Sequence, residues 1–118
     1  MKLNPKHIKI GNKVTIEIVQ GDIYTEETDS IVNMKANSNL DLEGQDRAKY
    51  VNAKECKQFI QNNGSVKTGA CGVSSGDGKV KSKRVIHAVP PIFKNFSQKN
   101  NENLLTALMI NILEMARS

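Results

Sequence analysis

The chain has 118 residues, a length that suits one domain and is too short for two, and its formal net charge is +5. Hydrophobic residues make up 38% and aromatic residues 4%, so a core has to be aliphatic. No apolar run approaches the roughly 18–20 residues that span a bilayer, and no apolar segment follows the N-terminal lysines as in a signal peptide. Two cysteines without such a signal predict free thiols in an intracellular protein of the nucleus or cytoplasm.

The basic balance, with a pI near 9.3, favours anionic partners such as nucleotides, phosphates or nucleic acid. The densest basic run, residues 79–84, is predicted to be a solvated turn before a strand. The charge allows nucleic-acid binding, but the sequence has no aromatic RNA-binding signature, zinc-finger spacing or P-loop. We therefore expect no metal site and no cofactor.

The first half of the chain predicts two strands, a polar loop and a helix. Residues 1–13 are interpreted as a basic N-terminal extension ahead of a domain at 14–118. Val14–Val19 alternates apolar and polar residues as a half-buried strand does, and Ser30–Asn33 predicts a short buried strand. An asparagine-rich loop follows, and Asp46–Gln61 is predicted to be a helix that stops at Asn62-Asn63-Gly64.

The second half predicts two more strands and a final helix. Small residues at Ala70–Ser75 and the apolar run Lys83–Val89 predict the strands. The helix is expected to take Asn100 or Asn101 as its N-cap. Its apolar stripe recurs at helical spacing: Leu104, Leu105, Leu108, Ile112, Met115. This order predicts an α/β fold, a mixed β-sheet flanked by helices.

Several short motifs occur in an order that resembles the macrodomain family, the ADP-ribose-binding module. They are V-Q-G-D-I ending at Ile23, D-S-I-V-N ending at Asn33, A-N-S ending at Ser38, K-T-G ending at Gly69, and V-I-H-A-V-P-P ending at Pro91. The likeness covers residues 14–118 and is closest to the non-catalytic macro-histone class. It implies a three-layer α/β/α fold that is incomplete, because the family's C-terminal strands and second phosphate loop would follow Ser118.

The resemblance implies a ligand site at the ends of the first strands. The adenine amine would be accepted by Asp22, with the Ile23 amide against the ring. The second asparagine of the family motif falls on Ala36 in an ungapped count and on Asn37 after a one-residue slip, and the sequence leaves both open. The ADP-ribose-binding residues expected from the family are Asp22, Ile23, Asn33, Ala36, Asn37, Leu42, Glu43, Gly44 and Gln45.

The phosphate loop departs from the family pattern. The family has several glycines there, whereas this chain has Asp41-Leu42-Glu43-Gly44. A carboxylate about 4 Å from a phosphate would oppose binding by about 4 kcal/mol at an effective dielectric of 20. We therefore predict a non-catalytic, weak binder of ADP-ribose, a related nucleotide or an ADP-ribosylated protein. The alternatives are a scaffold module without ligand and, third, an ADP-ribosyl hydrolase; an uncovered sheet edge would also favour self-association.

His87, in the middle of a predicted strand, is interpreted as a packed histidine rather than an acid–base group. A nucleophilic pair of Cys71 and His87 can be drawn, but no third group is placed to orient it. Cys56 is assigned to a helix face and the core. No catalytic residue is therefore predicted.

Overall fold

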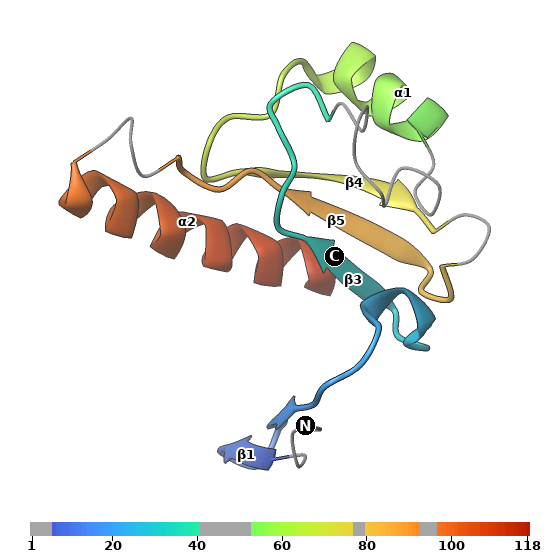
Figure 1. Cartoon of the computed structure of the whole chain (residues 1–118), viewed down its shortest axis with the longest axis vertical. Helices are drawn as coiled ribbons and strands as arrows, with labels where there is room; N and C mark the ends of the chain where they lie inside the picture. The colour runs from blue at the N-terminus through green and yellow to red at the C-terminus, as the bar shows by residue number, and fades with distance from the viewer. Residues whose placement is uncertain (1–5, 41–52, 77–79, 93–96) are drawn as a thin grey trace.

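The computed structural model describes residues 6–40, 53–76, 80–92 and 97–118. Its elements in chain order are strands β1 (Lys6–Ile10) and β2 (Val14–Ile18), the short 3-10 helix η1 (Ile23–Thr25), strand β3 (Ser30–Asn33), helix α1 (Ala53–Asn63), strands β4 (Cys71–Ser75) and β5 (Arg84–Ala88), and helix α2 (Gln98–Arg117). Strand β5 lies between β3 and β4, parallel to β3 and antiparallel to β4. The predicted α/β fold with a mixed sheet is confirmed (Figure 1).

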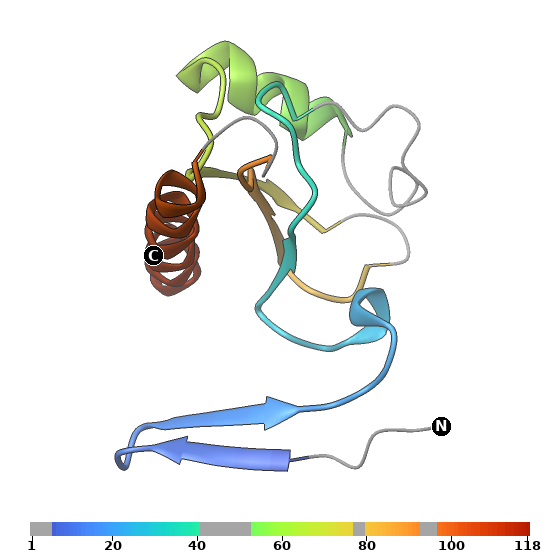
Figure 2. The ribbon, with the colours of Figure 1, turned by 60° about the vertical axis from the view of Figure 1, so that its left-hand side comes forward.

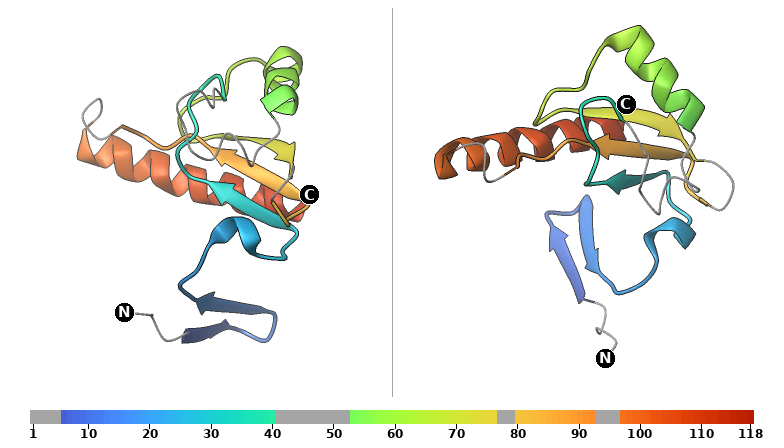
Figure 3. Two further views of the ribbon diagram at one scale, coloured as in Figure 1. Left: turned by 45° about the vertical axis from the view of Figure 1, so that its right-hand side comes forward. Right: turned by 45° about the horizontal axis from the view of Figure 1, so that its top comes forward.

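The two faces of the mixed sheet carry separate hydrophobic clusters because side chains alternate along each strand. Ile31 and Val85 are direct neighbours in the sheet and belong to the cluster on the α1 side. The next pair, Val32 and Ile86, belongs to the cluster with Leu108 of α2. The two helices therefore cover opposite faces of one sheet, as both views of Figure 3 show.

Strands β1 and β2 form a separate antiparallel hairpin around the turn at residues 11–13. Every residue of both strands is exposed, and Figure 2 shows the hairpin apart from the mixed sheet and the helices. The strand predicted at Val14–Val19 exists, but the prediction that it is half-buried is wrong, since no described element packs on its apolar face. Sequence analysis also missed β1, which lies within the segment interpreted as an N-terminal extension.

Helix α2 starts earlier than predicted. Its N-cap is Ser97, whose hydroxyl accepts the Asn100 N–H at 3.2 Å, and not Asn100 or Asn101. Asn101 is instead buried in the first turn, at 2% exposure. Serine is as good a cap as asparagine, so the two are not distinguished by residue type alone. The predicted stripe is confirmed, with Leu108 and Ile112 buried.

The remaining elements lie where they were predicted, within one or two residues at their ends. Helix α1 is described from Ala53 and ends at Asn63, before Gly64, while the predicted start at residues 46–52 lies outside the described part. Strand β4 starts one residue later than predicted, and β5 is one residue shorter than predicted at each end.

Candidate functional site

A pocket opens where the parallel strands β3 and β5 end. Its volume is about 410 Å³. The loop after β3 forms one wall, and the K-T-G segment and the residues after β5 form the rest; the lining residues are Met34, Lys35, Ala36, Asn37, Ser38, Thr68, Val89, Pro90, Pro91 and Ile92. The carboxyl ends of parallel strands are where α/β sheets commonly bind ligands, because loops from neighbouring strands converge there.

Backbone hydrogen bonds hold the loop after β3 against the sheet. The Ala36 N–H donates to the Ala88 carbonyl at 3.2 Å, and the Val66 N–H donates to the Ser38 carbonyl at 2.7 Å. Leu40 then turns the chain with a φ of 51°, an uncommon value for a residue with a side chain. Its side chain is 3% exposed and packs in the α1-side cluster, so burial holds this turn in place.

The opposite wall is tied to β5 through a glycine. The Gly69 N–H donates to the Val89 carbonyl at 2.9 Å, and the Val89 N–H donates to the Ala70 carbonyl at 3.1 Å. Gly69 has a φ of 90°, in the left-handed region that favours glycine. The K-T-G motif therefore brings Thr68 to the pocket by means of this turn.

A buried polar cluster centred on His87, which is 0% exposed, adjoins the pocket loop through Asn33, whose Oδ1 accepts the Lys35 N–H. Asn33 Nδ2 is 3.3 Å from His87 Nδ1, and on the other side of the ring Ser74 Oγ is 2.9 Å and Cys56 Sγ 3.5 Å from Nε2. Burial lowers the pKa of His87 from 6.5 to about 4, so the imidazole is neutral near pH 7. The expectation of a packed histidine agrees with this environment.

The nucleophilic pair drawn between Cys71 and His87 is not formed. Cys71 pairs with Ala88 in the sheet and packs on the α2 side, whereas His87 packs on the α1 side beside Cys56. Cys56 is 1% exposed, and burial raises the pKa of its thiol, so the thiol stays protonated and out of reach of a substrate.

The structure brings together part of the predicted site. Ala36 and Asn37, the two alternatives for one position, both line the pocket. Asp22 and Ile23 instead line a separate pocket of about 220 Å³, and Asp22 Oδ1 caps η1 by accepting the Tyr24 N–H at 3.0 Å. The predicted phosphate-loop residues Leu42, Glu43, Gly44 and Gln45 lie outside the described residues.

Sequence reasoning missed several pocket residues as members of the site. Thr68 and the segment Val89–Pro91 belong to the K-T-G and V-P-P motifs, which were read as family signals and not as binding residues. No sequence feature pointed to Lys35 as a pocket residue, because a lysine in a polar loop is ordinarily solvated.

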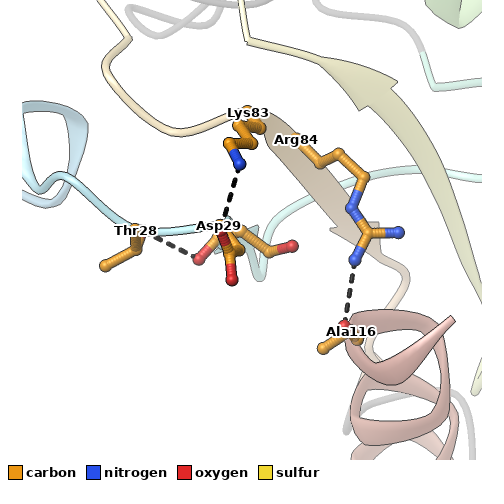
Figure 4. A network of polar contacts seen from close by, with 6 residues as sticks. Thr28, Asp29, Lys83, Arg84 and Ala116 are labelled. Carbon is orange, nitrogen blue, oxygen red and sulfur yellow. Dashed lines mark hydrogen bonds and ion pairs between the residues drawn. The ribbon is translucent and has the colours of Figure 1, made fainter.

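A wider and more open depression of about 790 Å³ lies at the other end of β3, where Glu27, Thr28 and Asp29 face Lys81 and Lys83. Lys83 Nζ is 3.7 Å from Asp29 Oδ1, and both side chains are more than four-fifths exposed, so this ion pair contributes little (Figure 4). Figure 4 also shows Arg84 donating to the Ala116 carbonyl at 3.0 Å, which ties the C-terminal end of α2 to β5. These contacts are structural.

Other kinds of site find no support in the described ranges. There, no three or more His, Cys, Asp or Glu side chains gather as metal ligands would, and both cysteines are free. None of the described helices is long and apolar enough to cross a membrane.

The macro domain family model matches residues 34–118, which include the whole pocket wall and both helices. The chain belongs to the macro domain family. This confirms the family resemblance, while the narrower likeness to the macro-histone class stays a prediction.

Named relatives support the macro domain assignment. A macro domain-containing protein of Caldanaerobacter subterraneus subsp. tengcongensis is 36% identical over 109 residues, which are 88% of this chain and 61% of that protein. One from Listeria monocytogenes is 35% identical over 106 residues, 86% of this chain and 59% of that protein. The chain thus spans about three-fifths of the length of these relatives.

Solved macro domain structures show the same fold. A mutant of the Oceanobacillus iheyensis macrodomain with ADPR superimposes with a TM-score of 0.78 at 30% identity, covering 95% of this chain and 63% of that one. The same macrodomain with ADP gives a TM-score of 0.77 at 32% identity, covering 95% and 62%.

Proposed function

We propose that this macro domain binds ADP-ribose or a related nucleotide, free or attached to a protein, without hydrolysing it. The observation that carries the proposal is the pocket at the carboxyl ends of β3 and β5, built on the loop after β3. Support comes from the Oceanobacillus iheyensis macrodomain, which has been solved with ADPR and with ADP. The net charge of +5 and the presence of Lys35 in the pocket also favour an anionic ligand.

Weak binding is proposed from the loop that follows. Asp41 and Glu43 follow Ser38, the last pocket residue of this loop, by three and five positions, and their charge opposes a diphosphate. Two free cysteines fit the proposed intracellular setting, where such nucleotides occur and thiols stay reduced.

Lack of hydrolysis is proposed from the chemistry of the pocket wall. None of its described lining residues is a carboxylate or a histidine, so the described wall offers no general base to activate water. Hydrolase activity therefore remains the third candidate. Release of ADP-ribose from a modified protein on incubation with this chain would establish it.

Isothermal titration with ADP-ribose tests the binding proposal. We expect micromolar to millimolar affinity, reduced about tenfold in Asn37→Ala if the amide makes one hydrogen bond to the ligand. Asn103→Ala, on the exposed surface of α2, is the matched control and should bind as the wild type does. Absence of heat at millimolar ligand with folded protein would contradict the proposal. An unchanged affinity in Asp22→Ala would mean that the separate Asp22 pocket takes no part.

The second candidate is the scaffold module without ligand, and the hairpin favours self-association as its interaction. One face of the β1–β2 hairpin is apolar except for Lys6, which lies opposite Ile18, and its apolar residues are 42–55% exposed: Ile8, Ile10, Val14, Ile16 and Ile18. The radius of gyration, 15.2 Å, exceeds the about 13.5 Å of a compact domain of this length, consistent with a hairpin that stands away from the body. Apolar surface of this kind favours a partner.

The partner that we favour for the apolar face of the hairpin is the β3 edge of a second copy of this chain. Strand β3 is an edge of the mixed sheet in the described part, and its sequence S-I-V-N has no lysine or proline to block pairing. We propose that the hairpin of one copy covers the β3 edge of another.

Sedimentation velocity at micromolar concentration tests this dimer. We expect a dimer for the wild type and a monomer for Ile16→Gln, which places an amide in the centre of the apolar face. Thr15→Gln changes the opposite face of the same strand and should stay dimeric. A wild-type chain that sediments as a monomer would contradict the proposed dimer.

A further inference from the structure

Four buried or partly buried side chains form a continuous polar path from α1 to the pocket loop. Cys56 of α1 and Ser74 of β4 lie at Nε2 of His87, and Asn33 of β3 lies at Nδ1. The path continues into the backbone, because the Lys35 N–H donates to Asn33 Oδ1 at 3.1 Å. Lys35 is the second residue of the pocket wall.

The hydrogen bonds assign the position of the imidazole proton. Asn33 Oδ1 is occupied by the Lys35 N–H, so the amide presents its Nδ2 donor to His87 Nδ1. Nδ1 must then accept, and in a neutral imidazole the proton is left on Nε2. There it donates to Ser74 Oγ at 2.9 Å, the shortest contact of the ring. The arrangement is satisfied in one tautomer only.

We infer that His87 is a positioning residue for the pocket: by holding the Asn33 amide in one orientation, it fixes the Lys35 backbone and with it the start of the loop. The effect on ligand binding rests on the proposed function, whereas the positioning role of His87 rests on the hydrogen bonds alone. The residue after His87 acts on the same loop, since the Ala88 carbonyl accepts the Ala36 N–H. Strand β5 thus fixes two consecutive pocket residues. His87 acts on the Lys35 N–H through the Asn33 side chain, and the Ala88 carbonyl binds the Ala36 N–H directly.

Without an acceptor at Nδ1, the Asn33 NH₂ group loses the hydrogen bond that stabilises this orientation of the amide. A buried NH₂ group that loses its partner turns or draws in water, and the Lys35 N–H then loses its acceptor. The ligand would meet a pocket wall that is no longer ordered in advance, and ordering it on binding weakens affinity.

A matched pair of substitutions separates positioning from packing. In His87→Asn the side-chain oxygen can replace Nδ1 as the acceptor for Asn33, whereas in His87→Gln the amide can replace Nε2–H as the donor to Ser74 and Asn33 loses its partner. Ser74→Ala is a second control, because it leaves the Nε2 proton without its partner and keeps the contact to Asn33.

Amide hydrogen exchange at Lys35, measured by NMR without ligand, is the first readout. We expect exchange at least tenfold faster in His87→Gln than in the wild type, and near wild-type exchange in His87→Asn and Ser74→Ala. ADP-ribose affinity should follow the same order, whatever the order of the three melting temperatures. Equal Lys35 exchange in His87→Gln and His87→Asn would overturn the inference.

The wild type alone supplies a second test that no unfolded variant can obscure. The ¹⁵N shifts of the His87 ring should show a protonated Nε2 and an unprotonated Nδ1, and the opposite tautomer would overturn the inference. If the wild type does not bind ADP-ribose, the proposed function fails, while the Lys35 exchange and the tautomer still decide the role of His87.

Discussion

Acidification is expected to lower the free energy of unfolding by about 3 kcal/mol between pH 6.5 and about 4, through His87. The pKa of His87 is lowered by burial from 6.5 in the unfolded chain to about 4 in the folded one. Between these values the unfolded chain binds a proton that the folded chain does not, so stability is fully present above pH 6.5 and declines as the pH falls. Urea unfolding at a series of pH values measures the effect.

The control is His87→Asn, which removes the titrating ring. Its stability should be nearly independent of pH between 6.5 and about 5, even if it is lower throughout. Hydrogen bonds from the Ser75 hydroxyl and N–H lower the pKa of Glu55, so Glu55 also loses stabilisation in acid, but below its ordinary value of 4.5. Because Glu55 is nearly fully solvated, its share is small. A wild-type slope identical to that of His87→Asn would contradict the assignment.

The substitution Gly76→Ala is expected to destabilise the fold by about 3 kcal/mol or more. A Cβ at this position would collide with the backbone carbonyl oxygen of Ser82 and press on Val80. The Gly76 N–H also donates to the Lys83 carbonyl at 3.0 Å, so the two backbones cannot separate without losing a hydrogen bond. The collision involves backbone, and no side-chain rotation can relieve it.

Gly21→Ala is the matched control for this prediction. A Cβ there meets only the Glu26 side-chain oxygen at 3.8 Å, an ordinary contact at the end of a flexible side chain. We expect the free energy of unfolding to change by no more than about 1 kcal/mol, because alanine also restricts the unfolded chain and so offsets part of any cost. Thermal or urea unfolding of both variants gives the comparison, and a small effect at Gly76 would show that the β4–β5 connection is able to move.

The fold could be predicted to the extent that local pattern determines it. Strands β5 and β3 are short apolar segments, as strands inside a covered sheet are. The apolar stripe on α2 recurs with a clear helical period. Strand β1 was missed because K-H-I-K-I is short and has more basic residues, two lysines and a histidine, than apolar ones. The exposure of β2 could not be predicted, since alternation predicts an apolar face and not what covers it.

The loop that lines the candidate pocket could be predicted from the sequence, but the way the other elements assemble around the pocket could not. Asn37 belongs to the loop after β3, and a polar loop between strand and helix is a general signal for ligand binding. Whether Asp22 reaches the same pocket depends on the path of the chain between the hairpin and β3, which no local pattern sets. The choice of Cys56 over Cys71 beside His87 depends on strand register, since one residue of shift moves a side chain to the other face of the sheet.

The parallel pairing of β3 with β5 has a consequence for the order in which the domain assembles. The β1–β2 and β4–β5 pairs join segments close in sequence, whereas the Asn33–His87 contact closes a loop of 54 residues. Closing a long loop has a larger entropy cost and slows folding. We therefore expect the hairpins to form first and β3 to join β5 late. Because the pocket lies at that junction, a chain emerging from the ribosome can complete the pocket only after the residues that follow β5 have been synthesised.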